Sequence, residues 1–436
     1  MSETKGLRSG RQTAAAAVAR AGALLLAAGI LWGCARPAAA IGLATSSASR
    51  AAGSPEDASA AAASLDAFGF DLYRRVSSTG GNLVFSPASI AIALSMANAG
   101  ARGETATQME SVLHSGAGAA SGNGMNSLDQ ALAALSGSFP DGAGKPMEVK
   151  LHIANAPFAQ GGMKIQQAYL DILASRYGAG LRLVDYNGDA AGACKLIDDW
   201  VSDQTEKRIP KLLDSLDPAT RLVLVNAIYL KAPWQTPFLD EATADASFTR
   251  PDGTTVSVPT MNASLETRYA SGSGWQAVEL PYVGGSLAMT IVVPNDMTAF
   301  ERSLDAARFD TIAGALSPAM VNLSLPRFKT ETSRDLAPVL ADMGMPLAMN
   351  PDRADFSGIT SDEALYVSRV VHQANISLDE KGTEASAATA VIMASATAVP
   401  GEIVTLHVDR PFLFALRDTK TGAILFLGRI VDPSAT

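Results

Sequence analysis

One segment of the sequence is Asp379-Glu380-Lys381-Gly382-Thr383-Glu384-Ala385-Ser386-Ala387-Ala388-Thr389-Ala390-Val391. Its composition is that of neither a core strand nor an ordinary loop. Small and β-branched residues predominate in it, and no turn signal follows until Pro400-Gly401. A stretch this long without a core pattern indicates a functional segment, although a flexible alanine-rich loop would share the composition. Alternate residues of an extended chain lie on one face. Here that face would carry only small side chains, able to slide between two strands: Thr383, Ala385, Ala387, Thr389 and Val391.

A strand is expected directly before this segment, over residues 366–378. Alternate positions of that strand form one predominantly apolar face, made of Val370, His372, Ala374, Ile376 and Leu378. The other strand-like runs of the sequence are 221–230, 287–293, 321–328 and 424–431.

Helices are expected mainly in the first half of the chain. Ser86-Pro87 supplies a hydroxyl for the N-cap and a proline for the first turn of one helix. The residues that follow, 90–97, are apolar on every side, as in a buried helix. Helical spacing also occurs over 165–176. Because helices prevail early and strands late, the sequence predicts an α+β fold.

The first 40 residues resemble an export signal. A basic lead precedes the apolar run 21–32, which is shorter than the roughly 20 residues of a spanning helix. The run ends in Leu31-Trp32-Gly33-Cys34, which resembles a lipoprotein cleavage box with Cys34 as the lipid-bearing residue. Cleavage after Ala38-Ala39-Ala40 is the alternative. The chain is therefore expected to be exported, and either anchored at the outer membrane or periplasm by its lipid alone or secreted.

Three segments follow from this interpretation. Residues 1–33 are expected to be the signal peptide. Residues 34–60 are rich in Ala, Ser, Gly and Pro and are expected to form a flexible tether. From there the chain is continuously patterned, so residues 61–436 are expected to form one domain.

The composition excludes several function classes. The 436 residues are 47% hydrophobic and 18% charged, which is too apolar for a disordered chain. A net charge of -9 gives no basic footprint, so no nucleic-acid partner is expected. Cys34 and Cys194 are the two cysteines, too few for a disulfide framework, and Cys194 is expected to be a structural thiol. No motif of an enzyme occurs, and neither a metal nor a cofactor is expected.

Seven short motifs carry a resemblance to a known family. They are Asn82–Ile90, Ala99–Thr105, Ile197–Val201, Leu224–Lys231, Asp379–Thr389, Asp409–Phe414 and Phe426–Arg429. In order and spacing they resemble the signature segments of the serpins, over about residues 65–433. The departures are small. Asp198 stands where the family usually has asparagine, and Lys207 where it usually has glycine. Ala232 and Pro233 stand where the family often has glycine and lysine before Trp234.

The resemblance implies a fold and a mechanism. Serpins have three β-sheets, about eight or nine helices and an exposed reactive-centre loop. A target serine protease cleaves this loop and forms a covalent acyl-enzyme, and the cut end then inserts into the central sheet. The protein is accordingly expected to be a monomeric inhibitor that acts as a suicide substrate, without a cofactor.

The resemblance also implies site residues within the segment that follows the 366–378 strand. The hinge would comprise Glu380, Gly382, Thr383, Glu384, Ala385, Ser386, Ala387, Ala388 and Thr389. Counting from this hinge places the reactive bond at Ala396–Thr397, within one or two residues. A small residue before the bond suits elastase-like or subtilisin-like proteases. No Arg or Lys lies between Lys381 and Arg410, so trypsin-like targets are not expected.

Two polar groups correspond to switch regions of the family. The shutter, a buried network beneath the central sheet, would comprise Ser86, Ser89, Asn226 and His372. The breach, where insertion begins, would comprise Trp234, Arg327 and Glu380. Arg327 could also be a simple surface charge. The rival function is a non-inhibitory surface-binding protein of the same fold, and the small residues of the hinge favour inhibition.

Overall fold

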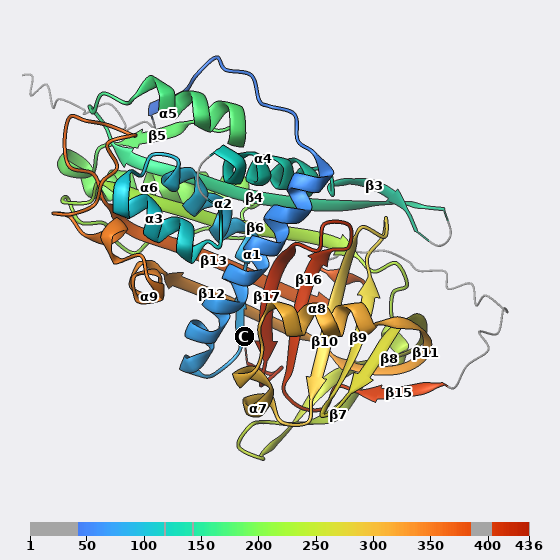
Figure 1. The fold of residues 1–436 in the computed structure, drawn as a ribbon. Coiled ribbons are helices and arrows are strands. Elements are labelled where there is room, and N and C mark those ends of the chain that lie inside the picture. The colour runs from blue at the N-terminus through green and yellow to red at the C-terminus, as the bar shows by residue number, and fades with distance from the viewer. Residues whose placement is uncertain (1–41, 117–118, 142–143, 385–402, 436) are drawn as a thin grey trace, which may run out of the picture. The chain divides into compact units, whose positions relative to one another are not determined.

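The computed structural model describes residues 42–116, 119–141, 144–384 and 403–435, and Figure 1 shows their arrangement. Contacts join these residues in one unit. The described residues form nine α-helices: α1 Pro55–Val76, α2 Pro87–Asn98, α3 Gly103–Val112, α4 Ala119–Ala133, α5 Gln167–Ile172, α6 Tyr186–Gln204, α7 Met297–Arg302, α8 Ala306–Ala315 and α9 Ala337–Met343. Four short segments add single turns: η1 Ser77–Thr79, η2 Leu173–Tyr177, η3 Asp240–Ala242 and η4 Pro346–Met349.

The strands of the described residues are β1 Gly42–Ala44, β2 Leu83–Phe85, β3 Gly137–Pro140, β4 Pro146–Gln160, β5 Leu181–Val184, β6 Leu222–Pro233, β7 Ala244–Thr249, β8 Thr255–Gly272, β9 Trp275–Pro281, β10 Leu287–Pro294, β11 Ser317–Pro326, β12 Phe328–Asp335, β13 Val367–Asp379, β14 Gly382–Thr383, β15 Val404–His407, β16 Phe412–Asp418 and β17 Ile424–Ile430. The predicted α+β class is confirmed.

Hydrogen bonds join the strands into two sheets. The first has the order β1-β5-β4-β6-β14-β13-β12, with β3 on β4. The second has the order β15-β11-β8-β9-β10-β16-β17-β2, with β7 on β8. Three sheets were expected from the resemblance. Two form because β8 runs without a break: its first part pairs with β7, its last part with β9, and β11 lies along its other side.

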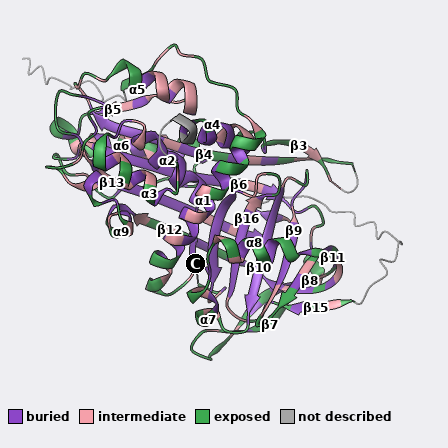
Figure 2. Cartoon of the chain, viewed as in Figure 1, coloured by how far each residue is buried: buried purple, intermediate pink, exposed green. Residues whose placement is uncertain are grey.

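Helix α2 lies between the two sheets. It contacts β4 and β6 of the first sheet and β17 of the second. The Ser86 side chain accepts a hydrogen bond from the Ser89 N–H, as expected for an N-cap. Residues 87–97 are all buried, and Figure 2 shows α2 among the buried strands. The prediction of a buried helix beginning at Ser86-Pro87 is confirmed.

The run 321–328 was expected to be one strand, and the structure divides it. β11 ends at Pro326 in the second sheet, and β12 begins at Phe328 in the first. Proline has no N–H for a ladder, so a strand commonly ends beside it. Arg327 is the residue at which the chain crosses from one sheet to the other, and its N–H donates to the Pro259 carbonyl at 2.9 Å.

The segment 34–60 was predicted to be a flexible tether. The structure describes its residues 42–60 and shows them packed against the domain. β1 pairs with β5 at the edge of the first sheet, and α1 begins at Pro55. Between them, Arg50 binds Asp129 at 2.5 Å, and Ala51 N–H donates to the Ser175 carbonyl at 2.8 Å. We call residues 42–54 the N-terminal strap. The domain therefore includes residues upstream of the expected boundary at 61.

Cys194 lies in α6, and its side chain is buried against the following loop. It is 8% exposed, and burial raises the pKa of its thiol. A raised pKa disfavours the reactive thiolate, so the structure agrees with a structural thiol.

Two departures from the family pattern lie in this region, Asp198 within α6 and Lys207 in the turn after it. Lys207 has φ +65°, a left-handed backbone that glycine adopts more easily. Asp198 Oδ1 accepts the N–H groups of Leu212 and Leu213, both at 2.9 Å. Burial raises the pKa of Asp198 more than these bonds lower it. Asp198 therefore fastens α6 to the following loop, but at the cost of a partly buried charge.

Replacing Asp198 should separate these two effects. Asp198→Ala leaves two N–H groups without their acceptor and should lower the free energy of unfolding by about 1–3 kcal/mol. Asp198→Asn keeps an acceptor oxygen without the charge and should be at least as stable as the native chain at neutral pH. Urea unfolding of both variants measures this. Asp199→Ala is the matched control, because Asp199 is exposed and pairs only with Lys195. Equal loss in all three variants would contradict this account.

Candidate functional site

Two neighbouring strands of the first sheet separate at one end. β6 and β13 run parallel and pair directly from Leu222 to Ile228 and from Val367 to Ala374. Beyond this point β14 lies between them, antiparallel to both. Thr383 lies opposite Ala232 on one side and Leu378 on the other. β6 and β13 are therefore paired along most of their shared length and held apart at one end by two residues of the predicted hinge, Gly382 and Thr383.

Backbone geometry limits what can occupy this position. Gly382 has φ +145°, and a Cβ there would lie 2.2 Å from the Ala232 carbonyl oxygen. Only glycine therefore fits beside β6. At Glu384 the backbone is left-handed, with φ +47°, and its N–H donates to the Ser377 carbonyl at 2.9 Å. The extended conformation thus ends directly after Thr383.

The three residues predicted for the breach lie together around β14. Arg327 contacts the Glu380 carboxylate at 2.5 Å, and the Glu380 side chain is 3% exposed. Burial alone would raise the pKa of Glu380, but hydrogen bonds from Arg327 and Thr243 outweigh it and leave the pKa below its usual value. The indole N–H of Trp234 donates to the Asp379 carbonyl at 3.0 Å. Arg327 is thus the partner of a buried charge rather than a solitary surface charge.

An aromatic stack closes the underside of this region. Trp234 stacks on Tyr282 with ring centroids 4.3 Å apart. The Tyr282 hydroxyl lies 2.6 Å from the Thr383 hydroxyl, and both residues are fully buried. Thr383 thus already points toward the core between the two sheets.

A second acidic side chain lies on the opposite face of the sheet. Glu384 is in ion-pair contact with Arg208 at 3.3 Å, without the geometry of a hydrogen bond. Burial raises the pKa of Glu384, and Arg208 opposes the effect. The resemblance had placed Glu384 in the hinge, but nothing in the sequence indicated Arg208 as its partner.

The four residues predicted for the shutter form one buried chain of contacts. Ser86 N–H donates to His372 Nε2 at 3.1 Å, and His372 Nδ1 lies 2.5 Å from Asn226 Oδ1. Ser89 N–H donates to the Ser86 hydroxyl at 3.1 Å. The network lies where β6 and β13 pair directly, since His372 is opposite Asn226. It therefore links the N-terminus of α2 to the two strands.

Sequence reasoning missed a fifth member, Asn155 of β4. Its Oδ1 accepts from the Ser89 hydroxyl at 2.8 Å, and Asn155 lies opposite Asn226 in the ladder. The amide nitrogens of Asn155 and Asn226 are buried and have no acceptor among the described residues. Unmet buried donors cost free energy, so the closed sheet is not fully satisfied at this level.

The contacts of His372 define its tautomer. Because Nε2 accepts the Ser86 N–H, the ring proton lies on Nδ1 and is donated to Asn226. Burial lowers the pKa of His372 from 6.5 to about 3. The imidazole is therefore neutral throughout the physiological range.

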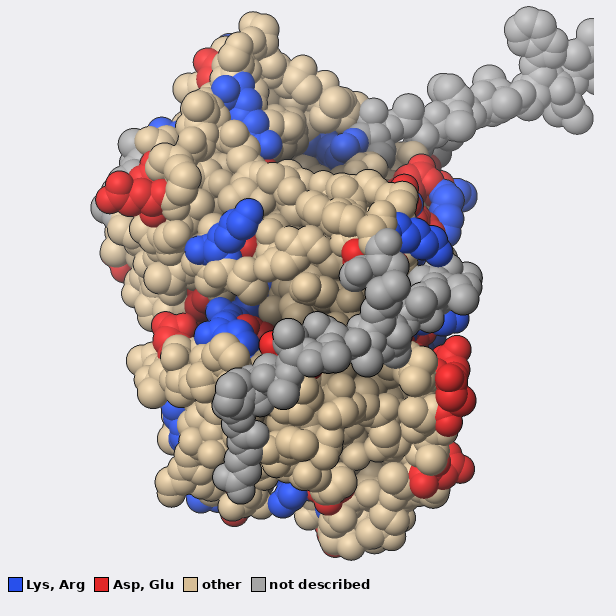
Figure 3. All heavy atoms as spheres, turned by 90° about the vertical axis from the view of Figure 1, so that its right-hand side faces the viewer, with Lys and Arg blue, Asp and Glu red and all other residues tan. Residues whose placement is uncertain are grey.

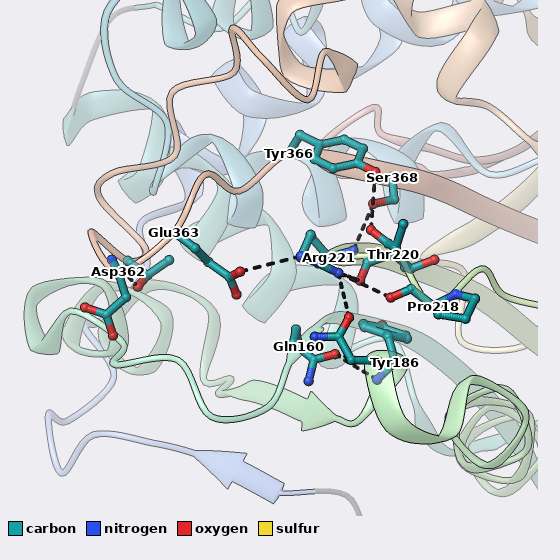
Figure 4. A network of polar contacts seen from close by, with 12 residues as sticks. Gln160, Tyr186, Pro218, Thr220, Arg221, Asp362, Glu363, Tyr366 and Ser368 are labelled. Atoms are coloured by element: carbon teal, nitrogen blue, oxygen red, sulfur yellow. Dashed lines mark hydrogen bonds and ion pairs between the residues drawn. The ribbon is translucent and has the colours of Figure 1, made fainter.

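The far end of the same pair of strands is held by a network around Arg221, which Figure 4 shows. Arg221 N–H donates to the Ser368 hydroxyl at 3.0 Å, and its guanidinium donates to Asn187 Oδ1 at 2.9 Å. Glu363 lies 3.6 Å from the same guanidinium. These contacts join the start of β6 to β13 and α6, so the strands are fixed at this end. No sequence pattern had indicated this network.

Several predicted site residues lie outside the described residues. They are the hinge residues Ala385, Ser386, Ala387, Ala388 and Thr389, the reactive bond Ala396–Thr397 and the lipid-bearing Cys34. In the described part of the chain, no group of three His, Cys, Asp or Glu side chains could hold a metal ion. Within the same residues no helix is both long and apolar enough to cross a membrane.

The pKa of His372 predicts a pH dependence. A histidine whose pKa is lowered by folding stabilises the native state fully above its unfolded pKa, and this contribution is lost as the pH falls toward the folded pKa. Between about pH 7 and about pH 5 the loss should reach up to about 2 kcal/mol. Urea midpoints of native protein and His372→Gln should diverge in this range, because the variant lacks the titration. His407→Gln, at an exposed histidine, should follow the native protein. Parallel pH curves for all three would contradict the assignment.

Comparison with known proteins relates this geometry to a family. Residues 63–433 match the family model described as Serpin (serine protease inhibitor). An uncharacterised serpin-like protein of Thermococcus kodakarensis is 38% identical over 373 residues, which are 85% of each chain. The leukocyte elastase inhibitor of Equus caballus is 37% identical over 384 residues, 84% of this chain and 97% of that protein.

A solved structure shows the same fold. The thermophilic serpin tengpin in its native state has a TM-score of 0.77 and 26% identity, covering 88% of this chain and 97% of that one. The family description and the elastase inhibitor name inhibition rather than catalysis, in agreement with the expectation that this chain is not an enzyme. The chain belongs to the serpin family.

Proposed function

We propose that this serpin inhibits serine proteases as a suicide substrate. The protease serine Oγ forms an ester with the carbonyl carbon of Ala396, the peptide bond to Thr397 breaks, and the serine proton leaves on the new Thr397 amine. The chain before the cut then inserts into the first sheet before the ester is hydrolysed. The observation that carries the proposal is β14, which lies antiparallel between two parallel strands at the end of the sheet.

The register of β14 supports the length of the inserted strand. Continuing the pairing of Thr383 with Ala232 and Leu378 would place Thr389 opposite Asn226 and His372. There a threonine hydroxyl could accept from the unmet Asn226 amide. The same register would place Met393 opposite Leu222, where β6 begins. A bond at Ala396–Thr397 lies just beyond the last residue that β6 could pair.

The burial of Thr383 explains why the segment that follows it carries small side chains at alternate positions. Thr383 faces Tyr282, so alternate residues of a continued strand would face the same core. Those residues are Ala385, Ala387, Thr389 and Val391. Small side chains need little displacement of the core, which favours rapid insertion over release of the enzyme. A non-inhibitory surface-binding protein would have no such requirement.

The target class follows from the residues at the bond. Ala396 suits the shallow specificity pocket of elastase-like or subtilisin-like proteases, and one relative is named an elastase inhibitor. Figure 3 shows acidic and basic side chains in small separate groups among uncharged residues on the face it presents. Among the described residues of that face, no continuous charged patch offers electrostatic steering, so the loop sequence would carry most of the specificity.

We further propose that the protein is exported and anchored through an acylated Cys34 at the outer membrane or periplasm, acting as a monomer. The cleavage box at 31–34 supports the anchor. Seven residues, 35–41, lie between Cys34 and the start of the strap at Gly42. Fully extended, these would span at most about 30 Å, so the domain would stay close to the membrane surface.

The proposal predicts a covalent complex. Incubation with an elastase-like or subtilisin-like protease should give a denaturant-resistant band of combined mass on a gel. Ala387→Arg should yield mainly cleaved inhibitor, because insertion would carry a charged side chain, without a partner, onto the buried face that Thr383 already occupies. Each penalty of about 1.4 kcal/mol on the insertion barrier slows insertion about tenfold. Ala387→Ser, which keeps a small side chain, is the control and should still form the complex.

Detection of cleaved native protein with fully active enzyme at every ratio would contradict inhibition. The binding-protein alternative would then explain the fold. Equal complex formation by Ala387→Arg would instead leave inhibition intact and refute insertion of this segment into the first sheet.

Lipidation has its own test. Mass spectrometry of the protein purified from its own membranes should find a mature N-terminus at Cys34 carrying acyl chains. Cys34→Ser should release the protein from the membrane fraction. An unmodified N-terminus at Ile41 would refute the anchor and leave a soluble exported protein.

A further inference from the structure

A cavity of about 580 Å³ lies at the edge of the first sheet. β4 pairs with β5 only from Phe158 to Gln160, so residues 153–157 of β4 have no strand partner on that side within the described chain. The cavity fills the opening between β4 and the chain that leads from η2 into β5. The N-terminal strap, blue beside β5 in Figure 1, forms its outer wall.

Two residues of the lining carry a buried hydrogen-bond donor without an acceptor among the described residues. The donors are the Asn155 amide nitrogen and the Trp200 indole nitrogen. The Asn155 amide oxygen is already bound by the Ser89 hydroxyl. The unmet groups beside the cavity are therefore both donors, which suits an occupant with acceptor oxygens.

The charges of the lining favour an anionic occupant. Arg182 is half-buried, lies over the Trp200 ring at 4.7 Å, and has no ion-pair partner in the described residues. Arg50 and Asp129 also line the cavity but neutralise each other at 2.5 Å. The lining thus has one positive charge in excess, beside the two unmet donors.

The remaining wall includes the polar side chains of Thr45, Ser46 and Gln204 and an apolar part. Ile92 and Met96 of α2 and Ile153 of β4 contribute to it, with Tyr177 of η2. A cavity of this volume is within the usual range for small organic ligands, which combine an apolar body with a few oriented polar contacts.

From these contacts we infer that the cavity binds a small organic carboxylate with an apolar body. The carboxylate would accept from Arg182, Trp200 and Asn155, and the body would pack on Ile92 and Met96. The inference does not rest on protease inhibition, because no residue of the lining belongs to β14.

The test compares ligands that differ only in the polar group. Isothermal titration of the full mature chain with octanoate should show saturable binding at one site. Octanamide should bind at least about tenfold more weakly, since a charge-assisted hydrogen bond is worth about twice a neutral one. Octylammonium should not bind. Octanoate should also change the tryptophan fluorescence, and this change should be lost in Trp200→Phe.

Two arginine variants identify the site. Arg182→Gln should weaken octanoate binding by about 10–100-fold, the loss of one charged hydrogen bond. Arg308→Gln is the matched control, because Arg308 also lies over an aromatic ring, that of Phe300, at 4.4 Å. Asn155 is not replaced, since it belongs to the buried network of Ser89.

Several outcomes would overturn the inference. They are no octanoate binding to the native chain, equal binding of the three ligands, and equal affinity of the Arg182→Gln and native proteins. If Arg182→Gln fails to fold, Arg182→Lys keeps the charge without the planar guanidinium and should weaken binding less. The fluorescence test with Trp200→Phe then decides independently.

Discussion

The structure depends on how two parallel strands share one sheet. β6 and β13 pair directly over part of their length, and β14 separates them at one end. A strand inserted between them would run antiparallel to both, so one parallel ladder would be replaced by two antiparallel ladders. Antiparallel pairing is slightly more stable per residue. The native arrangement is therefore closed at one end and open at the other to a strand whose first two residues are in place.

The contacts around β6 and β13 explain why the sheet opens between these two strands from one end. Arg221 fixes the start of β6 to β13 and α6, whereas Gly382 and Thr383 occupy the other end. Between them, His372 and Asn226 tie the strands to α2, with a neutral imidazole and one unmet amide. Opening the sheet must exchange these contacts for others. Thr389, inserted opposite Asn226 and His372, would offer a hydroxyl in their place. The polar network thus holds the closed sheet without making it optimal.

The sequence predicted the class, the helix at Ser86-Pro87 and the strand before the hinge, because capping and alternation are local signals. The same cap, Ser54-Pro55, begins α1 and was overlooked within an alanine-rich stretch. The break at Pro326-Arg327 was missed because Leu325 and Phe328 are apolar on either side of it, although the chain changes sheets there. Arg208, Arg221 and Asn155 could not be assigned, since their partners lie on distant segments. Resemblance supplied the shutter and breach residues, and the structure brings each set together without testing its function.

The central claim is that the chain after Thr383 is more stable inside the sheet than outside it. Differential scanning calorimetry before and after one cut near Ala396 tests it most directly. A protease of another class should make the cut, so that no acyl-enzyme forms, and mass spectrometry should verify the single site. The account predicts a higher unfolding temperature after the cut, because the freed segment can pair with β6 and β13. An unchanged or lower unfolding temperature would show that the segment does not insert and would contradict the account.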